Sequence, residues 1–168
     1  LDNCVGSGHF LLYEFDVLME IYKEYGYRER EAVEYILQDN LYGLDIDKRA
    51  RQLAYFSLMM KARSYDRRIL TKEIEPNLYA IPESNNVNKE YIDLFGLSLT
   101  VENRTLARKS IEELLSTFKY GKNFGSIIPV DAFDYDLCKA YIDDVDHSKI
   151  NIFTYDAYEF QKQIMTIL

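Results

Sequence analysis

The stretch NLYGLDIDKRA, residues 40–50, decides the fold together with DNCVGSG, residues 2–8. The first stretch predicts a buried strand that ends at Asp45, followed by a helix with Asp47 as its N-cap. The second predicts a glycine-rich turn leading into another helix, and such a turn lets the backbone approach a ligand closely. An acid at the end of the neighbouring strand can bind both ribose hydroxyls of an adenosine ligand. Together they predict a nucleoside-cofactor pocket at the carboxyl ends of adjacent parallel strands.

Apolar periodicity predicts the neighbouring elements of the first half of the chain. Spacings of three and four predict helices over residues 9–25, 29–38 and 48–62, and a further strand is expected over 78–81. This alternation is typical of an α/β fold, here a partial Rossmann-like parallel sheet with helices on both faces. We expect the cofactor-binding part to cover residues 1–85, with its first strand truncated to a stub at the start of the chain.

The second half, residues 86–168, changes in character and predicts an inserted helical subdomain with a following helix. Helices are expected over 89–95, 101–118 and 154–168, and part of the acidic stretch 131–146 is expected to be helical. A turn is expected at 120–125 and a short extended piece at 126–130.

Charge and cysteine content narrow the classes of protein. The chain has 168 residues, 48% of them apolar, and its 20 basic and 28 acidic residues give a net charge of −8. A domain that grips nucleic acid by its phosphates is basic on at least one face, so any main contact with DNA is expected outside these residues. Cys4 and Cys138 lie far apart, and no set of four zinc ligands is present, so no metal is expected.

Neither a membrane span nor a targeting segment is evident in the sequence. No apolar run reaches the roughly 18 residues that a spanning helix needs. The first ten residues carry no basic region of the kind that opens a signal peptide. We therefore expect a cytoplasmic protein with no membrane partner.

The glycine spacing distinguishes between two classes of nucleoside cofactor. A dinucleotide-binding turn normally reads G-x-G-x-x-G, with the ribose-binding acid roughly 20 residues further on. Here Leu11 occupies the third glycine position, and Asp45 lies 37 residues after Gly8. S-adenosylmethionine has no pyrophosphate to accommodate, so the pattern favours it as the cofactor.

The same residues carry a resemblance to a known family. Residues 2–10, DNCVGSGHF, resemble the D-P-A-C-G-S-G-H-F motif of adenine-N6 DNA methyltransferases, and residues 40–50 resemble the second motif of that family. Residues 53–62, LAYFSLMMKA, and 77–85, NLYAIPESN, continue the likeness. It is closest to the large single-chain enzymes of BREX-type phage-defence and restriction–modification systems.

The resemblance implies a class I methyltransferase fold and a role for individual residues. Asp2, Gly6 and Gly8 would surround the methionine part of S-adenosylmethionine. Asp45 would bind its ribose, and Ile46 would pack on its adenine. DNA would be bound through regions outside residues 1–168, and partner subunits of a defence system are a further expectation.

Three features bear on how far the resemblance extends. Glu83, which follows the expected strand 78–81, is expected where the family has a residue that faces the adenine amino group, although the family motif is variable there. Asn3 and Val5 replace a proline and a cysteine of the family motif. The catalytic N-P-P-Y motif is absent, because no two of the prolines Pro76, Pro82 and Pro129 are adjacent.

The missing motif leaves two interpretations of the function. No catalytic residue is assigned to this chain, and the motif is expected beyond residue 168 of a longer methyltransferase. The alternative is a non-catalytic methyltransferase-like module, used for interaction or cofactor sensing, or a decayed copy.

Overall fold

The computed structural model describes residues 1–144 and 154–168, and the chain divides into two units, Leu1–Ile81 and Pro82–Leu168. The change in sequence character predicts a division after residue 85. Ser84 belongs to the second unit because its amide donates to the Phe118 carbonyl and its hydroxyl to the Leu115 carbonyl. Each unit has its own apolar core.

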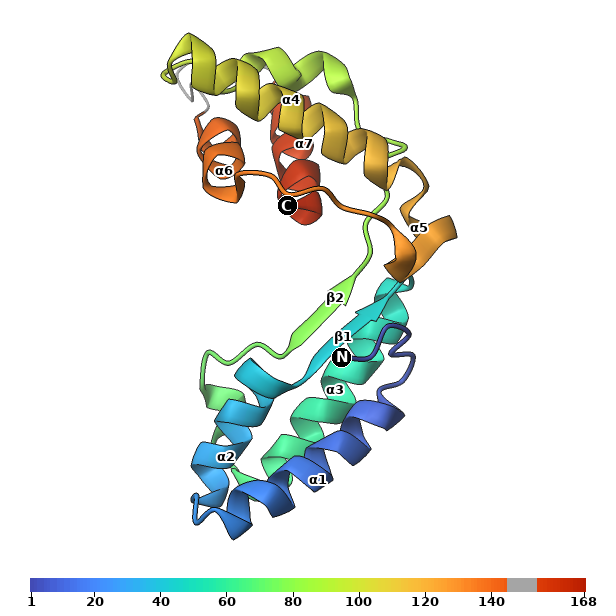
Figure 1. Ribbon diagram of the computed structural model, residues 1–168, viewed down its shortest axis with the longest axis vertical. Helices are drawn as coiled ribbons and strands as arrows, with labels where there is room; N and C mark the ends of the chain where they lie inside the picture. The colour runs from blue at the N-terminus through green and yellow to red at the C-terminus, as the bar shows by residue number, and fades with distance from the viewer. Residues whose placement is uncertain (145–153) are drawn as a thin grey trace. The chain divides into compact units, whose positions relative to one another are not determined.

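The first unit alternates helices with short strands, as the periodicity predicts (Figure 1). The predicted helix 29–38 continues as a π-helical turn at its carboxyl end. The elements are α1 (His9–Glu24), α2 (Glu29–Tyr35), the π-helical turn Ile36–Asn40, β1 (Tyr42–Asp45), α3 (Lys48–Tyr65), the 3-10 turn Ile69–Thr71 and β2 (Asn77–Ala80).

Strands β1 and β2 pair in parallel, which confirms the predicted strand direction. Their register places Gly43 opposite Leu78 and Asp45 opposite Ala80. The other edge of β1 is bonded to the N-terminal segment: the Asp2 amide donates to the Tyr42 carbonyl, and the Leu44 amide donates back to the Asp2 carbonyl. The N-terminal segment therefore adds a short parallel bridge beside β1.

The α-helices of the first unit share one core on one face of the sheet. Helices α1, α2 and α3 contact one another, and the core side chains that they bury include Leu78 of β2. Tyr79, the next residue of β2, points to the opposite face and is 55% exposed. Within residues 1–81 the prediction of helices on both faces is wrong, because α1, α2 and α3 all pack into this single cluster.

Gly43 allows the core to close against the sheet. An ideal Cβ at this position would lie 2.6 Å from Leu78 Cδ2, 2.9 Å from Val5 Cγ2 and 3.1 Å from Leu11 Cδ1. These separations are shorter than van der Waals contact, so any side chain here must displace its neighbours.

We expect Gly43→Ala to lower the free energy of unfolding by about 1–3 kcal/mol, the usual cost of overpacking a core. Circular dichroism during urea denaturation measures it. In a Leu78→Ala background the same substitution should cost less, because the nearest clashing atom is gone. An equal cost in both backgrounds would contradict this account.

A buried carboxylate anchors the chain where it leaves α3. Asp66 is 1% exposed; one of its oxygens accepts from Lys72 Nζ at 2.7 Å and the other from the Arg68 amide at 3.0 Å. Lys72 also pairs with Glu34 of α2. The hydrogen bonds from Lys72 and from the Arg68 amide lower the pKa of the Asp66 carboxyl below its ordinary value. The group therefore ties the loop after α3 back to α2.

A lowered folded-state pKa stabilises the fold above the unfolded-state pKa, near 3.9, and this contribution is lost as the pH falls through the folded value. We expect Asp66→Asn to cost roughly 1–3 kcal/mol of unfolding free energy at pH 7. The difference from the wild type should shrink below pH 4. Urea denaturation at several pH values tests this, with the exposed Glu73→Gln as control; a pH-independent difference would contradict it.

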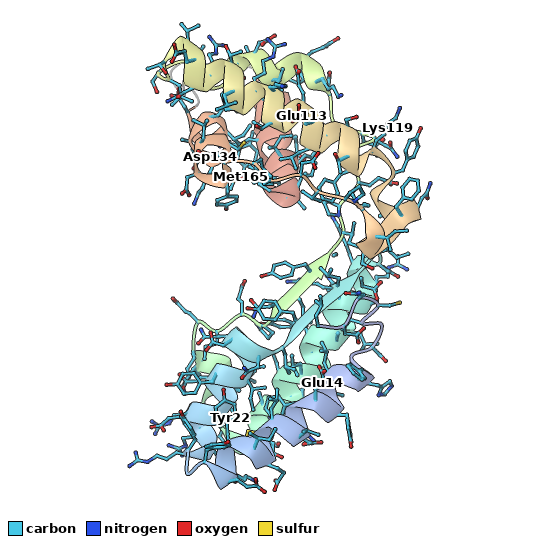
Figure 2. All side chains as sticks on the ribbon, in the orientation of Figure 1. Glu14, Tyr22, Glu113, Lys119, Asp134 and Met165 are labelled. Atoms are coloured by element: carbon cyan, nitrogen blue, oxygen red, sulfur yellow. The ribbon has the colours of Figure 1, made fainter. Side chains whose placement is uncertain are left out.

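The second unit is helical, and α4, α6 and α7 enclose its core (Figure 1). Asp134 lies at the start of α6 (Figure 2), where its carboxylate accepts from the Leu137 amide at 2.9 Å and caps the helix. The Tyr141 hydroxyl donates to the Ile92 carbonyl. The elements are the 3-10 helix Lys89–Leu94, α4 (Val101–Thr117), the 3-10 turn Phe118–Tyr120, α5 (Gly121–Phe124), the 3-10 turn Gly125–Ile127, α6 (Tyr135–Asp143) and α7 (Thr154–Ile167).

Two predictions for the second unit are corrected. The turn expected at 120–125 contains the short helix α5, and the extended piece expected from residue 126 begins only at Ile128. Gly125, at φ 59°, ends α5 and allows a further 3-10 turn. The stretch 131–146 is helical in part, as predicted, although residues 145 and 146 lie outside the described residues. In the described part of the chain, no helix is long and apolar enough to cross a membrane.

Candidate cofactor-binding site

The glycine turn lies beside the carboxyl end of β1. The Val5 amide donates to the Leu44 carbonyl at 3.0 Å, and the Asp2 carboxylate accepts from the Cys4 amide at 3.0 Å. The Gly8 amide then donates back to the Val5 carbonyl at 2.8 Å, which closes the turn. The loop is thus fixed to the sheet at its start and to itself at its end.

Gly8 is required at the point where the turn becomes a helix. Its φ of 86° lies in the left-handed region, which residues with a Cβ rarely adopt. A Cβ there would also approach Ala54 Cα and Cβ at 3.2 Å. Gly8 therefore brings the start of α1 against α3, so the predicted glycine turn is formed as the sequence indicates.

The Asp45 carboxylate is the centre of the site. It is 7% exposed; one oxygen accepts from the Gly6 amide and the other from the Asp47 amide, each at 2.8 Å. An ionised carboxylate offers about four acceptor positions, so two remain after these bonds. The structure therefore brings Asp45 and the glycine turn together, although 39 residues separate Gly6 from Asp45 in the sequence.

The first turn of α1 presents unpaired backbone donors, a feature that the sequence analysis missed. The N-cap, Gly8, has no side chain to accept a bond, and the first turn carries no acid. Among the described residues, no group accepts from the amides of Ser7, His9, Phe10 and Leu11. Four such donors and the helix dipole make the start of α1 suited to an anion. The signal in the sequence was a glycine where Ser, Thr, Asp or Asn usually stands.

The remaining predicted residues differ in their surroundings. Ile46 follows Asp45 directly and is 45% exposed, which leaves an apolar surface beside the carboxylate. Asp47 accepts from the Arg49 amide at 2.8 Å and caps α3, as predicted. Glu83 is exposed and belongs to the second unit, so its expected role stays a prediction.

Asp47 provides a test that separates capping from ligand binding. We expect Asp47→Ala to lower the free energy of unfolding by about 1 kcal/mol, because the Arg49 amide loses its partner. Thermal denaturation followed by circular dichroism measures the change, and Asp47→Asn should restore most of it. If both variants were as stable as the wild type, the cap would contribute nothing to the stability of α3.

A glycine turn and an acid at the carboxyl edge of a parallel sheet are typical of α/β proteins that bind nucleoside cofactors. No family model matches the chain. Two curated proteins are similar to it over most of its length: the adenine-specific methyltransferase PglX of Lacticaseibacillus casei (strain Zhang), 37% identical over 136 residues, and the adenine-specific methyltransferase BrxX of Escherichia coli O9:H4 (strain HS), 35% identical over 159 residues.

These alignments cover 81% and 85% of the chain but only 11% and 13% of the two relatives. The chain therefore belongs to the family of these adenine-specific methyltransferases and spans only a small part of their length. The resemblance inferred from the glycine turn and from residues 40–50 is confirmed.

Proposed function

We propose that this chain is the S-adenosylmethionine-binding segment of an adenine-N6 DNA methyltransferase of a bacterial restriction–modification or phage-defence system. The observation that carries the proposal is the buried Asp45 carboxylate, which is bonded to the glycine turn and keeps acceptor positions free. The similarity to adenine-specific methyltransferases supports the same conclusion.

The residues present fit the chemical groups of this cofactor. The open amides at the start of α1 suit the carboxylate of its methionine part. The free acceptor positions of Asp45 suit the two ribose hydroxyls. The exposed side chain of Ile46 offers an apolar surface for the adenine. Asp2, whose carboxylate accepts from the Cys4 amide, is proposed to lie beside the methionine part.

The two departures from the family motif fit the observed backbone. Val5 is buried, and its amide bonds to the Leu44 carbonyl, so the chain turns as needed without a cysteine at this position. Asn3 is exposed and lies between Asp2 and Cys4, which are already linked by a side-chain bond. Neither residue disturbs the bond between Gly6 and Asp45, so neither favours a decayed copy.

In the proposed reaction this chain binds and orients, and the target adenine is held elsewhere. When bound, S-adenosylmethionine would supply the methyl group, which would pass from its sulfur to the adenine amino nitrogen and leave S-adenosylhomocysteine. Orienting that amino group requires acceptors such as those of the N-P-P-Y motif, which this sequence lacks. The base-binding residues and the main contact with DNA are therefore proposed to lie in other parts of the longer protein.

We expect Asp45→Ala to weaken S-adenosylmethionine binding by roughly 10- to 100-fold, because charge-assisted hydrogen bonds to the ribose are lost. Isothermal titration calorimetry with the longer protein measures it. Asp47→Ala is the matched control, because it removes a neighbouring carboxylate. Within the described residues that carboxylate bonds only to the first turn of α3. The affinity should therefore stay within a factor of about two.

Tritium transfer to unmethylated DNA adds a second readout. The longer protein should transfer label to adenine, and the 168-residue chain alone should stay at background. Loss of binding in Asp47→Ala but not in Asp45→Ala would contradict the assignment of the ribose acid. Transfer by the 168-residue chain alone would show that the adenine-orienting residues lie within it.

A further inference from the structure

We infer that Asp45 also acts as a positioning residue, which assembles the glycine turn before any cofactor binds and so links the two ends of the cofactor site. The assembly of the turn stands on the geometry of this chain alone. The link between ribose binding and binding of the methionine part rests on the proposed function.

The carboxylate joins two loops that the sequence keeps far apart. One of its oxygens accepts a hydrogen bond from the Gly6 amide, in the turn before α1. The other accepts from the Asp47 amide, in the turn before α3. Each bond joins an ionised acceptor to a backbone amide at 2.8 Å, and the carboxylate is 7% exposed, so water competes weakly for it. One side chain thus sets the spacing between the starts of both helices.

The Gly6 bond holds a conformation that the loop would otherwise leave readily. Gly6 adopts a φ of 51°, and its would-be Cβ meets nothing closer than the Cys4 carbonyl at 4.0 Å. Glycine has the widest choice of backbone conformations in an unconstrained loop. Packing therefore does not define this residue. The bond from the Gly8 amide to the Val5 carbonyl closes the turn around Gly6, and the bond to Asp45 holds the Gly6 amide itself.

This bond also determines which amides are left for a ligand. The Gly6 amide donates to the Asp45 carboxylate, and the Gly8 amide donates to the Val5 carbonyl. The amides of Ser7, His9 and Phe10 donate to no group within the described residues. Asp45 turns the peptide at Gly6 inward and leaves the next donors unpaired at the start of α1. A ligand anion would then bind to a loop that is already ordered, so less conformational entropy would be lost on binding.

Amide hydrogen exchange of the chain without ligand tests the positioning role by NMR. We expect Asp45→Ala to speed exchange at Gly6 by roughly 10- to 100-fold, the equivalent of one lost charge-assisted bond. The amide of Leu58 in α3 should keep its protection and so report that the fold survives. Asp47→Ala, the matched control, leaves the Asp45 carboxylate in place and should leave Gly6 unchanged.

Asp45→Asn keeps the test decisive if the alanine variant fails to fold. Its carboxamide has one acceptor oxygen and one donor group, so it cannot accept from one amide at each end of the side chain as Asp45 does. Faster exchange at Gly6 or at Asp47 is expected. Unchanged exchange at both amides in a folded variant would overturn the inference, whatever the cofactor does.

A cofactor product without ribose hydroxyls tests the link between the two ends. We expect Asp45→Ala to weaken binding of the 2′,3′-dideoxy form of S-adenosylhomocysteine by at least about threefold, although that ligand has no hydroxyls for the carboxylate. Asp47→Ala should not change it. Equal affinity of wild type and Asp45→Ala for the dideoxy ligand would limit Asp45 to ribose contact and overturn the link.

The two proposals fail in different ways. If neither S-adenosylhomocysteine nor its dideoxy form binds, the proposed cofactor is wrong. The Gly6 exchange result still decides whether Asp45 assembles the turn, because that measurement contains no ligand.

Discussion

The rest of the first unit depends on the pairing of strand β1 at both of its edges. Only four residues form this strand, yet one edge is bonded to the N-terminal segment and the other to β2. Because β1 lies between them, the glycine turn and the end of β2 are held at the same edge of the sheet. The absence of a side chain at Gly43 lets α1 close on the strand, and Asp45 then ties the turn to the strand end.

The chemistry of the site follows from two kinds of group, the backbone amides at a helix start and a side-chain carboxylate. Helices α1 and α3 both begin at this edge of the sheet, but only α3 has a side-chain cap, from Asp47. The open start of α1 favours an anion, and the partly used carboxylate of Asp45 favours hydroxyl donors. A ligand with a carboxylate at one end and a ribose at the other carries both kinds of group, as the proposed S-adenosylmethionine does.

At the carboxyl end of α3, the first unit is stabilised by a group of paired charges. Asp66 and Lys72 form a charged pair that also reaches Glu34 of α2. This cluster lies at the end of α3 opposite to its capped start, so the two ends of the helix are fixed independently. Changes at Asp66 should therefore affect stability without touching the candidate site.

The sequence by itself determined most of the local elements and the family. Apolar periodicity predicted α1, α3 and α4 nearly to their ends, and the motif at residues 2–10 indicated the family, because both are properties of neighbouring residues. Only the tertiary structure decided that α1, α2 and α3 share one face of the sheet, and that α5 forms where a turn was expected. It alone showed that Asp45 accepts from Gly6, since a hydrogen bond across 39 residues depends on how the chain folds back and leaves no periodic trace in the sequence.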